Sequence, residues 1–337
     1  MMAKGPDKNI VSGNSRVKVT IYGQVNRAIR FASTQSKSHV QSVDNDQSSS
    51  RFALRASGKI NPNVSTTALV ELEVKTGHRS GQDIDDDSAE LFRMRHSTLS
   101  LSHKDMGTLS IGQTFIAGSL SGMFSYPSGV SIVFGPGGPG GDDGVTAEMA
   151  GDRFGPTFGL FASRQNTIKY QTPNLMGLSA NVSWNENRSW SAGASLSGLP
   201  GVKSIGVNVG VGYRQNEDSS VLAVSGGVKH NASGASIGGV YGYEDHDGGG
   251  KPTYWMVEAG WTGKINDMGS TSLGVGYGIW DDGGAGESTR YHGAVVQRVT
   301  AAATDVYVGG SHDTGTNAAG ADRDGVFVLI AGARIKF

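Results

Sequence analysis

Two pairs of arginines stand at even spacing in the first third of the chain, Arg51 with Arg55 and Arg93 with Arg95. Their neighbours are apolar, so on β-strands each pair would share one face of a sheet. Clustered guanidinium groups repel one another unless water or carboxylates screen them. A candidate screening group occurs later in the chain, namely Asp142, Asp143, Glu148 and Asp152. Facing each other across water, the two groups would set up a transverse field that sorts solutes by charge.

The sequence carries few groups that could break or form bonds. Zero Cys excludes disulfides, thiolate zinc sites and cysteine nucleophiles. The eight His are scattered without metal-ligand spacing, and no Gly-x-Ser-x-Gly elbow is present. The glycine-rich run 135–141 lacks the Gly-Lys-Ser/Thr ending of a phosphate loop. We therefore expect no enzyme, no cofactor and no metal, and the net charge of −1 argues against a nucleic-acid partner.

The elements that would position these arginines show a two-residue period almost throughout the chain. Clear examples are residues 17–26, 64–75, 204–214, 273–279 and 327–337, where apolar residues alternate with polar or glycine residues. Segments of about ten such residues match the length of a tilted strand that crosses a bilayer. No run approaches the ~18 apolar residues of a transmembrane helix. A membrane protein of this composition must therefore be a β-barrel.

Turn signals between these segments are of two kinds. Short turns such as 61–63, 104–107 and 266–269 alternate with long polar stretches, among which we count 35–50, 77–90, 244–252, 281–288 and 313–325. This asymmetry is typical of outer-membrane barrels. The sequence predicts an all-β, transmembrane antiparallel β-barrel of about sixteen strands. Residues 1–15 would form an N-terminal lead-in, and residues 16–337 a single barrel domain.

One connection, at about 116–163, is much longer than the others. It contains the apolar piece 130–134, then the Gly/Pro run 135–141, then the four acids named above. A connection of this length is normally functional or disordered. Because its apolar residues need a surface to pack on, we expect it to fold into the lumen and narrow it, as a constriction loop.

At this point the chain resembles the general Gram-negative porins, which are trimeric, sixteen-stranded diffusion channels. The resemblance runs from about Arg16 to Phe337, and the opening residues look most like alphaproteobacterial members. The stretches that carry it are 19–25, 50–55, 91–95 with 107–113, and 166–173. It implies that Arg51 points into a pore, that the protein is a homotrimer, and that Phe337 is the signal read by the outer-membrane assembly machinery. Gln171 departs from the pattern, because some members carry a further pore arginine there.

Aromatic residues in the apolar rows of the alternating segments suit the interfacial girdles of such a barrel. We predict this position for Trp255, Trp261, Phe327 and Phe337. The predicted partners are the lipid bilayer and lipopolysaccharide, and the acidic run 83–87 is one extracellular stretch that could reach lipopolysaccharide phosphates through divalent cations.

The resulting hypothesis is an outer-membrane porin of a Gram-negative bacterium. Ions and small hydrophilic solutes would diffuse passively through a wet lumen, selected by size and by the field between Arg51, Arg55, Arg93 and Arg95 and the loop acids. The strand positions expected to face inward carry an excess of basic residues, which weakly favours the passage of anions. Two alternatives stay open at this stage: an outer-membrane barrel enzyme, and an exported adhesin or β-solenoid. The first lacks a visible catalytic set and the second lacks a fixed repeat.

Overall fold

The alternating segments fold into strands of one large antiparallel sheet. The computed structural model describes residues 13–74, 92–119, 128–135, 138–139, 164–186, 188–284 and 286–337. The strands of the large sheet are β1 (Val17–Ser33), β2 (Ser38–Asp44), β3 (Arg51–Asn61), β4 (Val64–Val74), β5 (Phe92–His103), β6 (Gly107–Phe115), β9 (Arg164–Gln171), β10 (Leu178–Asn185), β11 (Ser189–Ser197), β12 (Ile205–Gln215), β13 (Ser219–His230), β14 (Ala235–His246), β15 (Thr253–Asn266), β16 (Gly269–Asp281), β17 (Glu287–Val299), β18 (Thr304–Gly315) and β19 (Val326–Lys336).

Short elements complete this list. β7 (Phe134–Gly135) and β8 (Gly138–Pro139) pair with each other in the connection between β6 and β9. The 3-10 helices among the described residues are η1 (Asp46–Ser48) and η3 (Thr300–Ala302). None of the described helical segments is long and apolar enough to cross a membrane.

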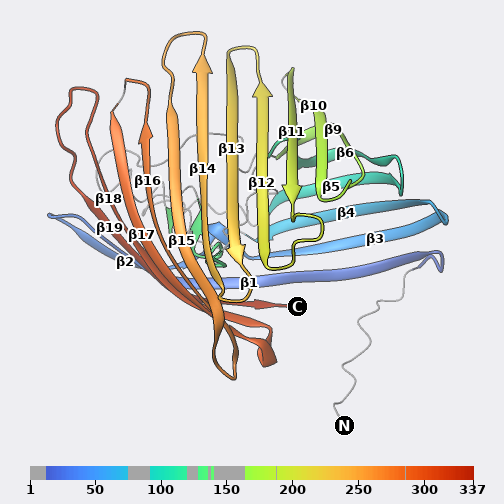
Figure 1. Cartoon of the computed structure of the whole chain (residues 1–337), viewed down its shortest axis with the longest axis horizontal. Helices are drawn as coiled ribbons and strands as arrows, with labels where there is room; N and C mark the ends of the chain where they lie inside the picture. Colours follow the sequence, from blue (N-terminus) through green and yellow to red (C-terminus); the bar gives the residue numbers. More distant parts are fainter. Residues whose placement is uncertain are drawn as a thin grey trace.

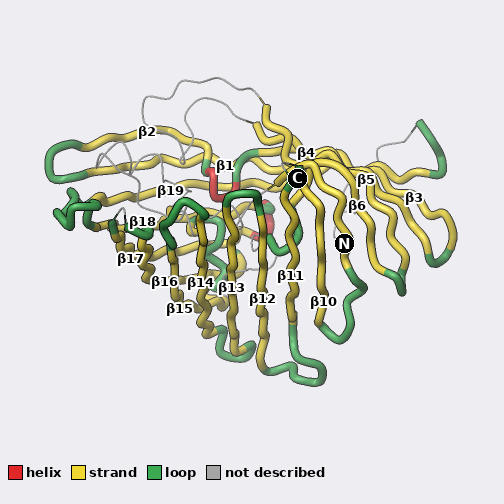
Figure 2. Tube along the Cα trace, turned by 90° about the horizontal axis from the view of Figure 1, so that it is seen from above, coloured by secondary structure: helices red, strands yellow, loops and turns green. Residues whose placement is uncertain are grey.

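The sheet closes on itself, because β1 pairs with β19 over ten residues from Gln24↔Lys336 to Ser33↔Phe327. Every other neighbouring pair is antiparallel and nearly always consecutive in sequence. In Figure 1, β11 to β15 run side by side, while β3 and β4 cross the view at a steep angle to them. The view from above shows the same strands following one another around the wall (Figure 2). The predicted closed β-barrel is confirmed.

One wall strand is broken in two. The C-terminal part of β1, Arg27–Ser33, pairs with β2, and its N-terminal part, Val17–Gln24, pairs with β3, so β2 and β3 are two parts of a single strand. Between Arg27↔Asp44 and Gln24↔Arg51, the six residues 45–50 stand opposite only two residues of β1. The described sheet has 17 strands, and counting β2 with β3 as one gives the sixteen expected of this barrel. The prediction of one long loop at 35–50 is wrong, because 38–44 pair with β1 and only 45–50 leave the sheet.

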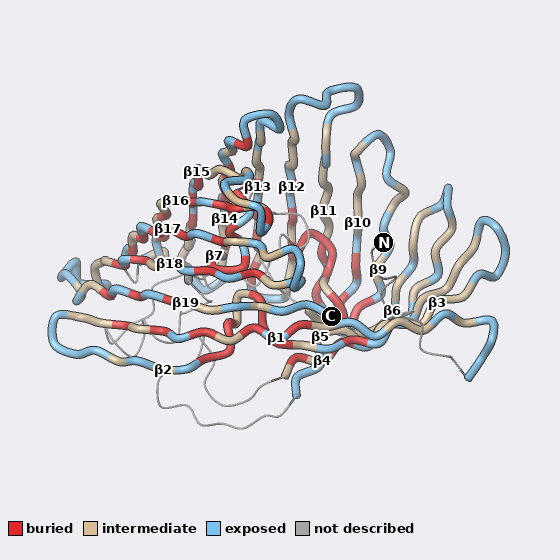
Figure 3. Tube along the Cα trace, turned by 90° about the horizontal axis from the view of Figure 1, so that it is seen from below, coloured by how far each residue is buried: buried red, intermediate tan, exposed pale blue. Residues whose placement is uncertain are grey.

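The two faces of the wall differ as the two-residue period predicts. Large apolar side chains such as Ile29, Leu99 and Val275 are exposed on the outer face. The alternate positions along each strand carry polar residues and glycines and face inward. A soluble protein could not expose so many contiguous apolar side chains, whereas a lipid-facing barrel must. Figure 3 shows that buried residues gather in the middle of the wall, while the strand ends and turns are exposed.

The described part of the connection between β6 and β9 packs against the inner side of the wall. Val130, Ile132 and Val133 are buried in an apolar cluster with wall residues of β1, β2 and β17 to β19. Inward-facing glycines make room for the connection. A Cβ added at Gly274 would lie 2.7 Å from Val130 Cγ2, and one at Gly309 would lie 2.6 Å from Val133 Cγ1. Glycine at these two positions is therefore a packing requirement of this segment.

Candidate functional site

A network of arginine and glutamate side chains lies on the inner faces of β3, β4 and β5. Arg95 donates from Nε to Glu71 Oε1 at 2.7 Å, and its NH1 lies 3.4 Å from Glu73 Oε2. Arg51 Nε lies 3.9 Å from Glu71 Oε1. The two glutamates are buried, whereas the Arg51 side chain keeps 26% of its surface exposed. Arg51 is thus partly neutralised by a carboxylate but still accessible from the barrel interior.

A β-bulge brings Arg95 into this network. Glu71 pairs with His96 and Leu72 pairs with Met94, so Arg95 is an extra residue without a partner on β4. The bulge lets Arg95 and His96 both reach inward, although they are adjacent in sequence. Arg95 NH1 also lies 3.3 Å from Ser49 Oγ in the break between β2 and β3. The irregular part of the broken strand therefore supports the arginine.

Two further cations belong to β9. Lys169 Nζ donates to the carbonyl of Phe115 at 2.8 Å. Arg164 lies over the Phe115 ring, 3.9 Å from its guanidinium carbon to the ring centroid, and interacts electrostatically with Arg95 and Glu73. His96 also contacts Phe115, with 5.3 Å between the two ring centroids. Gln171 itself is uncharged, but β9 thus brings two cations to Phe115.

Two further predicted arginines, Arg55 and Arg93, lie on the same strands as this network. Arg55 lies on the same inward row as Arg51 and is exposed, with Thr20 and Leu69 as its strand partners. Arg93 pairs with Glu73 across β4 and β5 and is also exposed. The four predicted loop acids, Asp142, Asp143, Glu148 and Asp152, lie outside the described residues. So does the acidic run 83–87.

A second charged cluster, not predicted from the sequence, surrounds Asp305 at the short-turn end of the barrel. Arg298 Nε lies 3.1 Å from Asp305 Oδ1, and Arg334 NH2 and Lys336 Nζ lie 2.7 Å and 3.4 Å from Oδ2. Arg334 NH1 also donates to Ser48 Oγ at 2.7 Å. Three cations share one carboxylate, so this part of the inner wall has an excess of positive charge.

Polar contacts hold the connection between β6 and β9 against the wall. Ser128 Oγ donates to Glu258 on β15, and Thr262 Oγ1 donates to the Ser128 carbonyl at 2.6 Å. His292 Nε2 lies 3.6 Å from the other oxygen of Glu258, and both side chains are almost completely buried. Asn45, in the broken strand, donates to the Ile132 carbonyl at 3.0 Å. Both ends of the apolar segment are therefore fixed by side chains of the wall.

The predicted girdle residues lie at two levels of the outer face. Trp255 and Phe327 lie towards the end with the long loops. Trp255 packs edge-on against Tyr277 with 5.5 Å between ring centroids, and the ring centroids of Phe327 and Phe31 are 6.4 Å apart. Trp261 and Phe337 lie towards the short turns. Trp261 donates from Nε1 to the Ser233 carbonyl at 2.8 Å.

Some members of these clusters carried a sequence signal and others did not. Lys169 lies within the stretch 166–173 on which the resemblance rests and Arg164 just before it, so their charge could have been noticed. The meeting of Arg334 with Asp305 and Ser48, and of Ser128 with Glu258, gave no signal, because these partners are more than twenty positions apart. Among the described residues, no group of three or more His, Asp or Glu side chains could hold a metal ion.

A family model described as Gram-negative porin matches residues 8–318. No curated protein sequence matches the chain.

Several solved structures share the fold at low identity. The anion-selective porin from Comamonas acidovorans has a TM-score of 0.66 at 17% identity, covering 95% of this chain and all of its own. The in-vitro folded trimer form of OmpT, an outer membrane protein of Vibrio cholerae, gives 0.64 at 16% identity, covering 96% of this chain and 100% of its own. The outer membrane channel DcaP of Acinetobacter baumannii gives 0.63 at 12% identity, covering 97% and 99%.

Proposed function

Because the chain belongs to the Gram-negative porin family, and is therefore an outer-membrane channel protein, we propose that it sorts the ions and small hydrophilic solutes that diffuse through it by size and by a transverse electrostatic field. The single observation that carries this proposal is the network of Arg51, Arg95, Glu71 and Glu73 on the inner face of the barrel.

The field would arise from the uneven charge of this wall. Three cations, Arg51, Arg95 and Arg164, gather around the two carboxylates of Glu71 and Glu73, and a fourth, Lys169, donates to the carbonyl of Phe115 beside Arg164. Fixed charges beside a narrow, water-filled passage act over roughly the Debye length of ~8–10 Å, which is comparable to the width of such a passage. Arg55 and Arg93 would extend the basic row towards either mouth. The acids Asp142, Asp143, Glu148 and Asp152 would form the opposing side.

The size limit would come from the connection between β6 and β9. Its residues 128–133 are packed and hydrogen-bonded against the inner wall, which supports the proposal that the whole connection narrows the passage. A passage lined by side chains on rigid strands selects solutes without any conformational step. No bond-breaking chemistry is required for this function.

We expect a weak preference for anions. The described inner wall has more cations than carboxylates both around Glu71 and around Asp305. The Comamonas acidovorans porin, which shares the fold, is described as anion-selective. At 17% identity this similarity is support by analogy only.

The partners follow from the outer face of the barrel. Its apolar row would contact the lipid bilayer, and the acidic outer loops would approach lipopolysaccharide through divalent cations. We propose a homotrimer, as in the trimer form of OmpT, and recognition of Phe337 by the outer-membrane assembly machinery.

The test is the single-channel conductance of the detergent-purified protein in a planar bilayer, with a salt gradient to give the reversal potential. Current steps that scale with salt concentration, in groups of three, are expected from an open trimer. A folded, detergent-stable barrel that inserts but never conducts would overturn the proposal and favour a plugged, enzymatic or adhesive barrel.

A further inference from the structure

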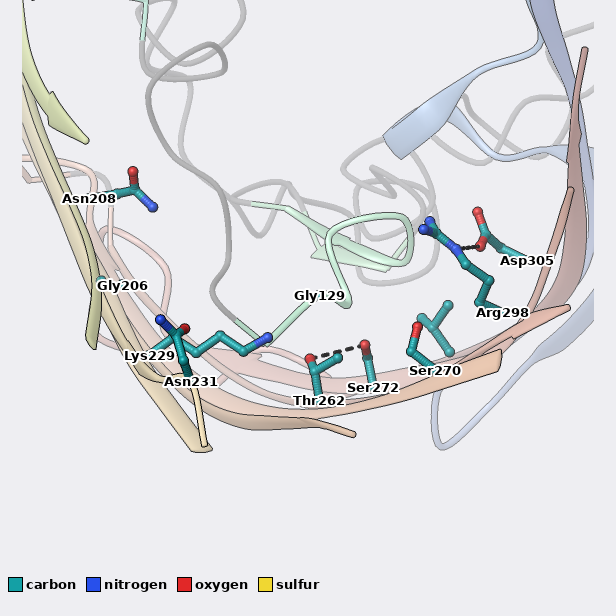
Figure 4. A pocket seen from close by; sticks show the side chains of 12 residues that line it. Gly129, Gly206, Asn208, Lys229, Asn231, Thr262, Ser270, Ser272, Arg298 and Asp305 are labelled. Atoms are coloured by element: carbon teal, nitrogen blue, oxygen red, sulfur yellow. Dashed lines mark hydrogen bonds and ion pairs between the residues drawn. The ribbon is translucent and has the colours of Figure 1, made fainter. Parts of the chain in front are cut away.

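A cavity of about 390 Å³ lies on the inner wall below the connection between β6 and β9, at the short-turn end of the barrel. Its lining comes from β12, β13 and β15 to β18, with Gly129 of the connection at its edge. Figure 4 shows the polar side chains of Lys229, Asn208 and Arg298 directed into this space, with Thr262, Ser270 and Ser272 between them. The cavity is separate from the network around Arg51, because none of its lining residues belongs to β3, β4 or β5.

The charges of this cavity favour an anion. Lys229 has no carboxylate of the described residues within ion-pair distance. Arg298 shares Asp305 with Arg334 and Lys336, so the single carboxylate of the lining is already neutralised by other cations. An ammonium and a guanidinium therefore stand on opposite sides of one small space, with a net positive charge. Such a space attracts anions over a distance of roughly a Debye length.

The uncharged polar groups of the lining favour a solute that also carries hydroxyl groups. Thr262 Oγ1 and Ser272 Oγ lie 3.2 Å apart on the floor of the cavity. Asn208 and Asn231 supply amides at its rim, and the Asn231 Nδ2 already donates to the Lys203 carbonyl at 2.8 Å. Hydroxyls and amides both donate and accept, so they pair well with the hydroxyl groups of a solute. An inorganic anion such as chloride would use only the two cations.

We propose that this cavity is a transient binding site for hydroxycarboxylates, of the size and chemistry of a sugar acid, on the periplasmic side of the narrowing. The carboxylate would lie at Lys229, and the solute hydroxyls would contact Thr262, Ser272 and the amides, while Arg298 on the far side adds to the positive potential of the cavity. Conduction requires that such a site bind weakly enough to release its solute. This inference rests on the proposed channel function and specifies its substrate class.

The first experiment measures block of chloride current by gluconate, with glucose and acetate as comparison solutes. We expect gluconate to produce brief interruptions that neither comparison solute produces, because glucose lacks the charge and acetate lacks the hydroxyls. The Lys229→Gln variant should bind gluconate about two- to fivefold more weakly, the range expected for one partly exposed charge pair. Lys203→Gln is the matched control, since it removes the same charge from an exposed turn at the same end of the barrel.

A chemical rescue separates charge from folding. The chain has no native Cys, so Lys229→Cys is a unique thiol. Modification with aminoethyl methanethiosulfonate restores an ammonium group and should restore gluconate block, whereas the neutral methyl reagent should not. Recovery by the charged reagent alone would exclude a general packing defect as the cause of weaker block.

Three results would overturn the inference while leaving the channel function intact: equal block of the wild type and Lys229→Gln, equal block by glucose and gluconate, or rescue by the neutral reagent. A folded protein that inserts and carries no current would instead overturn the channel function, and this inference with it.

Discussion

Gly23 on β1 and Phe337 exchange two backbone hydrogen bonds, from Gly23 N to Phe337 O at 2.9 Å and from Phe337 N to Gly23 O at 3.1 Å. The Phe337 ring covers the position that a side chain at residue 23 would occupy, since a Cβ there would lie 2.8 Å from Phe337 Cζ and 2.5 Å from the Arg51 carbonyl. The last residue of the sequence thus completes the seam of the barrel, directly beside the strand that carries Arg51.

Gly23→Ala should destabilise this seam. The added methyl group must displace a backbone carbonyl as well as the Phe337 ring, which costs about 1–3 kcal/mol. The measurement is the temperature at which the folded barrel loses its heat-modifiable migration on a gel. Gly226→Ala is the control, because its nearest neighbour would lie at 3.8 Å. Equal melting of both variants would show that the contact is not needed.

Variants at Phe337 distinguish the contribution of its ring from that of its backbone hydrogen bonds. Phe337→Ala keeps both hydrogen bonds and loses the ring, whereas deletion of residue 337 loses two bonds worth ~0.5–1.5 kcal/mol each. If the ring is the assembly signal, both variants should reduce the yield of folded barrel in the outer membrane, and Phe337→Tyr should not. Normal yield of the alanine variant would remove the ring from that role.

Arg51→Ala combined with Arg95→Ala should shift the channel towards cations. The two substitutions remove two positive charges and leave Glu71 and Glu73 without these partners. The anion-to-cation permeability ratio should fall by about twofold or more, read from the reversal potential in a salt gradient. Arg188→Ala provides a control, because Arg188 forms an exposed ion pair with Glu217 in an outer turn. An unchanged reversal potential in the double variant would contradict a role in the pore wall.

Gly274→Ala should displace the connection between β6 and β9. The added methyl group meets Val130 Cγ2 at 2.7 Å and Ser128 Oγ at 3.2 Å, and both atoms belong to the connection. If this segment limits the passage, single-channel conductance should change while the barrel remains folded. Gly226→Ala should leave conductance unaltered, because a Cβ there would meet only Asn208 O and Val209 Cγ2, both at 3.8 Å and both outside the connection.

Glu258→Gln tests the polar anchor of the same connection. The amide can still accept from Ser128 Oγ, but it no longer offers a charged partner to His292. Glu258→Ala removes both contacts and should raise open-channel current noise well above that of Glu258→Gln. Identical noise in the two variants would show that the Ser128 contact does not hold the segment in place.

The sequence by itself determined which residues face lipid and which face inward. Successive side chains on a strand point to opposite sides, so the period of Phe327 to Phe337 or of Leu273 to Ile279 is readable without any knowledge of neighbours. The same local rule placed Arg51 and Arg55 on one inward row. It also located β6 at Gly107–Phe115, with the long connection after it.

Only the tertiary structure decided where the period fails and which charges meet. The bulge at Arg95 and the break at 45–50 depend on register against β4 and β1, and register is set by contacts between segments far apart in sequence. The meeting of Asp305 with Arg334, and of Ser128 with Glu258, depends on closure of the barrel and on the path of the connection inside it. Strand alternation is a property of the local backbone, whereas these pairings exist only once the wall has closed.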